Sequence, residues 1–151
     1  KSGIDVLTFG GTKNGCLDAE AIIFFNSEDI KNFKYLQKRS GQLLSKMRFL
    51  SAQLDAYISN NLWYKNAKNS NNMAKILSTK LSGLNSIEIT YPTESNEVFV
   101  KIPKSIQDHL TKKGYYAVPD ETFDGSVRFV SAWNTTEKDI DKLVNTIREK
   151  L

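Results

Sequence analysis

The sequence predicts a mixed α/β fold, and three observations lead to that prediction. Two apolar runs of strand length, 4–9 and 21–25, lie close together near the N-terminus. Two long segments with helical spacing follow them. From about residue 85 onward, the patterns alternate in the order strand, strand, helix, strand, strand, helix. With 151 residues and 40% hydrophobic content, the chain is long enough to bury a core.

The two N-terminal strands are expected to enclose a loop over 10–18, in which Asn14-Gly15 is a strong turn signal. The lysine of this loop, Lys13, would then lie between two buried strands. An apolar strand in a parallel sheet needs cover on both faces, which little in this chain provides. Because the chain also begins with Lys1 rather than Met, we expect it to be part of a longer gene product.

Helices are expected in the middle of the chain. Ser27 is a good N-cap, and the two acidic residues after it favour a helix that starts there. Apolar residues then recur with helical spacing along one face of 42–60 and along one face of 62–81. The pair Ser82-Gly83 is expected to end the second of these helices.

The C-terminal part is expected to form a compact α/β unit. Strand-like alternation occurs in four short segments, 87–90, 97–102, 115–118 and 126–132. A short helix is expected over 105–113, where Gly114 ends it. Thr135 or Thr136 would cap a last helix, in which acidic residues come early and basic residues late, as the helix dipole favours.

Composition argues against several classes of protein. The net charge is +4 and the lysines are spread along the chain, so we expect no nucleic-acid partner. No apolar stretch approaches the about 20 residues that span a bilayer, so we expect no membrane partner. The single cysteine, Cys16, excludes an internal disulfide and is expected to pack as a small apolar residue. Metal-ligand spacing is not found, and His109 is expected to face solvent. Together these observations favour the cytoplasm.

Lys13 is the strongest candidate for chemistry. It follows two glycines and Thr12 on the loop between the first two strands. Lysine shifts its pKa readily when it is desolvated, and its neutral amine forms Schiff bases with carbonyl compounds. The glycine amides and the Thr12 hydroxyl could also approach an anion, although the spacing is not that of the nucleotide-binding phosphate loop. A solvated hairpin lysine without a chemical role is the alternative.

Two arginines are further candidates. Arg128 lies on the face of its expected strand opposite Val127 and Phe129. Its planar guanidinium either binds a substrate carboxylate or simply covers a sheet edge. Arg48 lies in a mostly apolar helix, where it either extends to solvent along the surface or contacts a phosphate across a subunit boundary.

Three segments carry a resemblance to a known family. They are residues 5–15 (DVLTFGGTKNG) with Glu20-Ala21 after them, residues 45–53 (SKMRFLSAQ), and residues 127–136 (VRFVSAWNTT). In this order they resemble the threonine aldolase family of pyridoxal-phosphate enzymes. The similarity is to the C-terminal part of its low-specificity L-threonine aldolase branch. It covers essentially the whole chain, and 71–74 also fits it.

The resemblance implies an α/β fold of a particular kind, the C-terminal part of the type I pyridoxal-phosphate-dependent transferase fold. Residues 1–60 would be the end of the large cofactor-binding domain and would contain the lysine loop. Residues 61–84 would be a bridging helix, and residues 85–151 a small C-terminal α/β domain.

The resemblance also implies roles for single residues. Lys13 would be the catalytic lysine that holds pyridoxal 5′-phosphate covalently. Thr12 and Arg48 would be further cofactor-binding residues, Arg128 would bind the substrate carboxylate, and no metal is implied. No residue here can be assigned to the family's glycine-rich phosphate turn, to the aromatic ring stacked on the pyridine, or to the aspartate paired with the ring nitrogen.

The implied reaction is the reversible cleavage of L-threonine, or of another β-hydroxy-α-amino acid, to glycine and an aldehyde. The implied partners are the N-terminal half of the same enzyme and further copies in a homotetramer, and the isolated chain is expected to be inactive. Two alternatives stay open. One is another pyridoxal-phosphate-dependent β-eliminating lyase or aminotransferase relative, and the other is a non-catalytic fragment that acts only in association.

Overall fold

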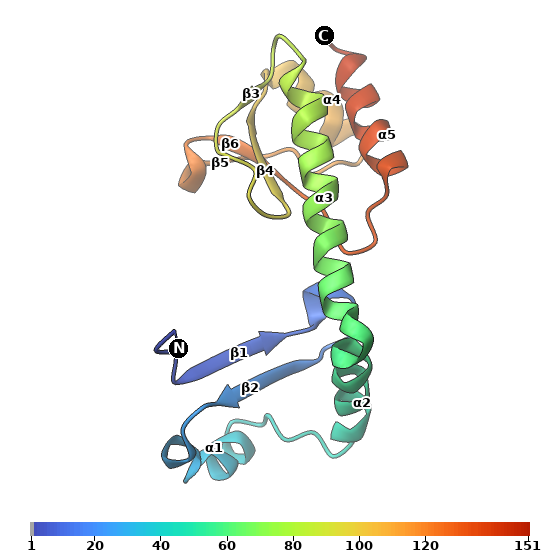
Figure 1. Ribbon diagram of the computed structural model, residues 1–151. Coiled ribbons are helices and arrows are strands. Elements are labelled where there is room, and N and C mark those ends of the chain that lie inside the picture. The colour runs from blue at the N-terminus through green and yellow to red at the C-terminus, as the bar shows by residue number, and fades with distance from the viewer. Residues whose placement is uncertain (1) are drawn as a thin grey trace. The chain divides into compact units, whose positions relative to one another are not determined.

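The computed structural model describes residues 2–151 and confirms the mixed α/β fold. The chain forms two compact units. The first ends at Tyr64 and the second runs from Lys65 to Leu151, which Figure 1 colours from green to red. None of the helices within residues 2–151 combines the length and the hydropathy that crossing a membrane requires.

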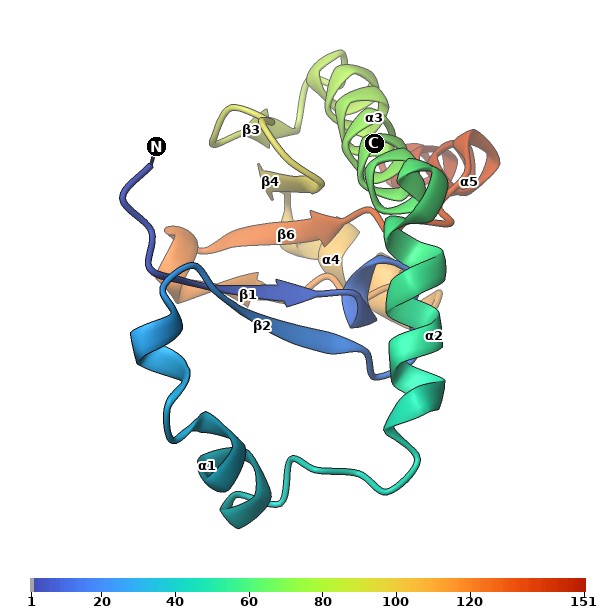
Figure 2. The same cartoon turned by 60° about the horizontal axis from the view of Figure 1, so that its bottom comes forward.

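The first unit opens with a β-hairpin. Strand β1 (Val6–Gly10) pairs antiparallel with strand β2 (Glu20–Phe24), and the register places Gly10 opposite Glu20. Figure 2 shows the two strands side by side and running in opposite directions. The loop between the strands is short enough to return the chain directly alongside β1, so the two strands form a hairpin.

The strands of the hairpin are not buried, contrary to the expectation from their apolar sequences. Four of their side chains are 38% to 48% exposed, namely Val6, Leu7, Ile22 and Ile23. A two-stranded sheet has two faces and two edges, and the described residues of this unit cover them only in part. Phe9 is an exception, since its ring lies 5.8 Å from that of Tyr57 and 6.4 Å from that of Trp63.

The helices that follow the hairpin differ from the sequence prediction at their starts. Asn26, not Ser27, provides the N-cap, because its side-chain oxygen accepts the N–H of Glu28 at 3.0 Å. Only a 3-10 turn begins there, η2 (Ser27–Ile30), and the helix α1 (Phe33–Arg39) follows it. Gly41 then takes a left-handed φ of +72°, which ends the helical path. Helix α2 (Met47–Ile58) begins at Met47 rather than near residue 42.

A short irregular turn separates α2 from the longest helix. Asn60 and Asn61 adopt left-handed φ angles of 54° and 56°, which asparagine tolerates better than most residues. Helix α3 (Leu62–Ser82) begins directly after them. It ends within one residue of the predicted position, before Gly83. The apolar spacing therefore correctly predicted that this segment is a helix and where it begins and ends.

The second unit contains a four-stranded antiparallel sheet. Its strands, in the spatial order β3-β4-β6-β5, are β3 (Glu88–Ile89), β4 (Glu97–Lys101), β6 (Ser126–Val130) and β5 (Pro119–Asp120). The expected strand over 115–118 is wrong. Ala117 is buried while Tyr116 and Val118 are exposed, so the side chains alternate there, but the backbone does not pair in a sheet.

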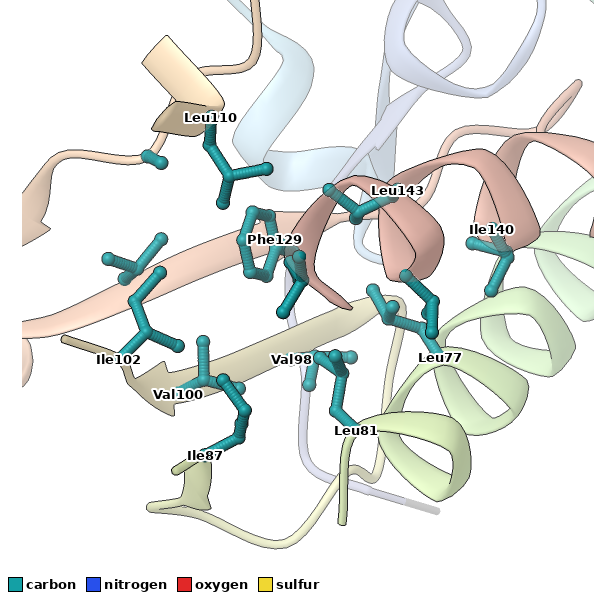
Figure 3. Close-up of a cluster of buried hydrophobic side chains, with 14 of the residues drawn as sticks. Leu77, Leu81, Ile87, Val98, Val100, Ile102, Leu110, Phe129, Ile140 and Leu143 are labelled. Carbon is teal, nitrogen blue, oxygen red and sulfur yellow. The ribbon is translucent and has the colours of Figure 1, made fainter. Parts of the chain in front are cut away.

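One face of this sheet carries the hydrophobic core of the second unit. Helices α3, α4 (Lys104–Lys112) and α5 (Glu137–Arg148) all contribute buried side chains to it. Figure 3 shows part of the core, including Leu77, Leu81, Val98, Val100 and Phe129. Because strand side chains alternate between faces, the intervening residues of β4 and β6 are left on the opposite face of the sheet.

Thr136, one of the two residues that the sequence offers as the cap, is the N-cap of helix α5. The Thr136 hydroxyl accepts the N–H of Asp139 at 3.3 Å, and the Asp139 carboxylate accepts the N–H of Thr136 at 2.9 Å. This reciprocal pair is a capping box, and it satisfies N–H groups that the helix itself leaves without partners. Hydrogen bonds from the side chain and the backbone of Thr136 hold the pKa of Asp139 below its usual value.

Thr136→Ala is expected to lower the free energy of unfolding by about 1 kcal/mol, because it removes the hydroxyl that caps α5. Urea unfolding followed by circular dichroism measures the change. Thr111→Ala is the control, since the exposed Thr111 hydroxyl donates to the C=O of Gln107 inside α4 and caps nothing. A loss no larger than that of the control would contradict the role given to the capping box.

Candidate functional site

The lysine turn is a tightly bonded connection between β1 and β2. It contains a 3-10 turn over Thr12–Asn14, with Lys13 at its centre. The C=O of Gly11 accepts the N–H of Asn14 and that of Cys16, both at 3.0 Å. The N–H of Gly11 donates to the C=O of Ala19 at 2.8 Å. Backbone hydrogen bonds from one glycine therefore hold both ends of the turn that carries the lysine.

The side chain of Asn14 ties the turn to the helices of the same unit. Its Nδ2 donates to the hydroxyl of Tyr57 at 2.5 Å and to the C=O of Trp63 at 3.0 Å. Tyr57 is only 3% exposed, so this anchor is well packed. Gly15 takes a left-handed φ of 112°, which confirms the turn signal of Asn14-Gly15. The backbone of residue 13 is thus fixed from two directions.

Lys13 itself is exposed and lines an open hollow of about 510 Å³ within the first unit. The other lining residues are Thr8, Gly10, Thr12, Asp18 and Glu20. The lysine is therefore accessible to solvent rather than enclosed by buried strands, because the strands that carry it are themselves exposed. Any ligand of this hollow would meet one amine, two hydroxyls and two carboxylates.

The two carboxylates of the hollow were not recognised from the sequence. Glu20 is the first residue of β2, and the antiparallel register places it directly opposite Gly10. Its Oε1 accepts the N–H of Thr12 at 3.3 Å, and the missing side chain at Gly10 leaves the space that its carboxylate occupies. The available signal was the hairpin itself, since antiparallel pairing around a short loop brings these residues together.

Cys16 lies beside this group and is half-buried. Burial raises the pKa of its thiol, and the negative charge of Glu20 raises it further. A thiol whose pKa is raised stays protonated and is a poor nucleophile near neutral pH. This agrees with the expectation that Cys16 is a small packing residue.

Arg48 occupies the first turn of α2 and is exposed. Its guanidinium carbon lies 4.7 Å from the centre of the Phe49 ring, which is a cation–π contact. Among the described residues that line the lysine hollow, Arg48 does not appear. Lys13 and Thr12 are therefore brought together in one turn, while Arg48 stands apart from that hollow on α2.

Arg128 belongs to the second unit, on the outward face of β6. The neighbouring Val127 and Phe129 are buried, as the alternation predicts. The Arg128 Nη1 lies 3.2 Å from Oε1 of Glu97 on β4, and its guanidinium carbon lies 5.8 Å from the Phe123 ring centre. Glu97 was not recognised from the sequence, because its proximity follows only from the strand register.

His109 is not solvent-facing, which corrects the expectation from its polar helix. Its side chain is only 14% exposed, and its Nε2 lies 3.0 Å from the carboxylate of Glu149 on the chain segment after α5. The hydrogen bond with His109 and then the charge of Lys113 hold the pKa of Glu149 below its usual value. Among the side chains that the structure describes, there is no cluster of metal-ligating groups.

A family model for beta-eliminating lyases matches residues 1–105. The chain belongs to the beta-eliminating lyase family. The match includes the lysine turn and Arg48, whereas Arg128 lies beyond its C-terminal limit. The family assignment of the sequence analysis is confirmed by this match and by the relatives below.

Individual relatives of this family member are threonine aldolases. The chain is 40% identical over 150 residues to a low-specificity L-threonine aldolase from a Pseudomonas species, and 35% identical over 150 residues to one from Pseudomonas aeruginosa. Each comparison covers 98% of this chain and 42% of the relative. The chain therefore spans less than half the length of these curated relatives.

A solved structure confirms the predicted fold class. The threonine aldolase of Leishmania major matches with a TM-score of 0.85 at 28% identity, over 96% of this chain and 43% of that one. That enzyme has the type I pyridoxal-phosphate fold, and the lyase-family chain described here corresponds to part of it.

Gly11→Ala is expected to destabilise the protein more than Gly10→Ala. A Cβ at Gly11 would lie 2.8 Å from the Cys16 sulfur and 3.1 Å from the C=O of Ala19, a backbone group that the turn holds in place. A Cβ at Gly10 would meet only the tip of the flexible Glu20 side chain, which can move away. Melting temperatures of the two variants measure the difference, and equal values would contradict the expected order.

Proposed function

We propose that this chain is part of a pyridoxal-phosphate-dependent lyase that cleaves L-threonine and other β-hydroxy-α-amino acids to glycine and an aldehyde. The observation that carries the proposal is its 40% identity over 150 residues with the low-specificity L-threonine aldolase of a Pseudomonas species. The position of Lys13 in an open hollow supports it, because the reaction needs an amine that a carbonyl compound can reach.

The residues around Lys13 fit the aldehyde end of pyridoxal 5′-phosphate. Lys13 supplies an exposed amine, and Thr12 supplies an exposed hydroxyl next to it in the same hollow. The cofactor, once bound, supplies an electron sink for the bond that breaks at the α-carbon. We therefore assign Lys13 as the catalytic residue, and Lys13 and Thr12 as cofactor-binding residues.

The same hollow suits the phosphate group less well, since Asp18 and Glu20 bring negative charge to it. Arg48 is the better candidate for the phosphate. Its guanidinium is exposed and has no carboxylate partner within residues 2–151. Consistent with the resemblance noted above, we assign Arg48 to a phosphate contact at a subunit boundary.

Arg128 is our candidate for binding the substrate carboxylate. An arginine fork binds a carboxylate through two charge-assisted hydrogen bonds, which are roughly twice as strong as neutral ones. A fixed carboxylate orients the bond between Cα and Cβ, and orientation alone lowers the barrier substantially.

We further propose that the rest of the same enzyme covers the hairpin, and that the complete protein is a cytoplasmic homotetramer. The 42% coverage of the relatives and the exposed apolar side chains of β1 and β2 support a covering partner. In this proposal, 1–60 ends the large domain, 61–84 is the bridging helix that α3 forms, and 85–151 is the small domain. The chain alone would then be inactive.

Two other possibilities differ in simple assays. Another β-eliminating lyase or an aminotransferase relative would use the same cofactor to break a different bond of its substrate, and activity with threonine, serine and a keto acid separates these reactions. A non-catalytic chain would associate with partners through its exposed apolar residues. In that case, a complete protein that contains this chain would not develop the visible absorbance of a lysine-bound cofactor when it is mixed with pyridoxal 5′-phosphate.

Lys13→Ala in the complete enzyme is expected to abolish the visible absorbance of the lysine-bound cofactor, because no amine remains to form the covalent link. Borohydride reduction followed by peptide mass spectrometry locates the link directly. Lys34→Ala is the matched control, an exposed lysine of α1 that lies outside the lysine hollow. Cofactor attached to another lysine in the wild-type enzyme would remove Lys13 from this role.

Arg128→Ala is expected to raise the KM for threonine about 10-fold or more, since a hydrogen-bonded charge pair with the substrate is lost. Steady-state kinetics of the complete enzyme measures it. Arg148→Ala, at the end of α5, is the control for the loss of one exposed arginine. An unchanged KM in the Arg128 variant would move the carboxylate site elsewhere.

A further inference from the structure

We infer that Glu97 is a positioning residue that orients the guanidinium of Arg128 for the substrate carboxylate. The inference rests on the proposed role of Arg128. The observation behind it is the ion pair between the two side chains, in which Arg128 Nη1 donates to Glu97 Oε1 at 3.2 Å.

The strand register explains why the two side chains meet. In the antiparallel pair β4 and β6, Arg128 lies opposite Phe99, and Glu97 lies opposite Val130. Glu97 and Arg128 are therefore diagonal neighbours on the same outward face, a distance that long side chains span. The inward face of the same strands packs into the core, so the backbone that carries both groups is rigid.

A ring on the same face restrains the guanidinium further. Its carbon lies 5.8 Å from the centre of the Phe123 ring, and that ring lies 4.7 Å from the ring of Phe99. The guanidinium is thus held by a carboxylate and by an aromatic ring. A free arginine side chain has many rotamers, and ordering it before the ligand arrives removes that entropy cost from binding.

The contact with Glu97 leaves donors for a second carboxylate. A guanidinium carries five N–H donors in one plane, and the 3.2 Å contact uses Nη1. The side chain of Arg128 is also 43% exposed, so a ligand can reach the donors that remain. Glu97 therefore restrains the orientation of the guanidinium and leaves its other N–H donors free for the substrate carboxylate.

The charge of Glu97 has the opposite effect, because a carboxylate near Arg128 also repels the carboxylate of the substrate. The two effects differ in how strongly water weakens them. Glu97 is 32% exposed, and solvent screening reduces charge–charge repulsion at such a site. The orientation of the guanidinium by a hydrogen bond is not screened in the same way, and we expect orientation to be the larger effect.

The test uses the complete enzyme with Glu97→Ala, Glu97→Gln and Arg128→Ala, and also the variant with both Glu97→Ala and Arg128→Ala. Glu94→Ala is the control, an exposed glutamate just before β4. The expected result is an increase of about twofold to fivefold in KM for threonine in Glu97→Ala, with kcat unchanged. Glu97→Gln keeps a neutral acceptor and is expected to have a smaller effect. In the background of Arg128→Ala, removal of Glu97 should add nothing.

Two inhibitors separate positioning from a general structural effect. Glycine carries a carboxylate, and its inhibition constant is expected to rise in parallel with KM. The amino alcohol 2-aminoethanol lacks a carboxylate, and its inhibition constant should stay unchanged.

A rise in the inhibition constants of both inhibitors would indicate a disturbed site and overturn the inference. An unchanged or lowered KM in Glu97→Ala would overturn it as well. If Arg128→Ala also leaves KM unchanged, the role proposed for Arg128 fails with it; if Arg128→Ala raises KM, only the inference about Glu97 fails.

Discussion

The position of the lysine depends on a backbone constraint at a single buried glycine. Gly11 accepts two N–H groups and donates a third hydrogen bond, all within the connection between β1 and β2. A side chain at this position would meet the Cys16 sulfur and the C=O of Ala19. A residue without Cβ therefore closes this turn without displacing its neighbours, and Lys13 is placed by that closure rather than by contacts of its own side chain.

The second unit places its functional candidate by a different route. The alternation of a strand sends Val127 and Phe129 into the core and leaves Arg128 on the other face. The same alternation in β4 buries Val98 and turns Glu97 outward. The same alternation of side chains therefore buries the core residues and exposes the ion pair. A shift of register by one residue would turn the core residues outward and the charged residues inward.

Much of the architecture follows from local sequence patterns, and the misjudged side chains Glu20, Glu97 and His109 have a common cause. The apolar spacing of α3 and the cap of α5 depend only on residues near one another in the chain. The sequence predicted that helix, and it narrowed the cap of α5 to Thr135 or Thr136. The places of Glu20, Glu97 and His109 depend on partners brought close by strand register or by helix packing. Strand register and helix packing cannot be derived from a single sequence, so the carboxylates of the lysine hollow were missed.

The exposed apolar side chains of the hairpin link the order of the lysine turn to whatever covers them. A two-stranded sheet alone is at best marginally stable in water. Any molecule or segment that buries Val6, Leu7, Ile22 and Ile23 therefore binds the formed hairpin in preference to the open one, and it stabilises the turn between the strands by the same free energy. Burial of these strand faces and ordering of the turn that carries the Lys13 amine are therefore thermodynamically coupled.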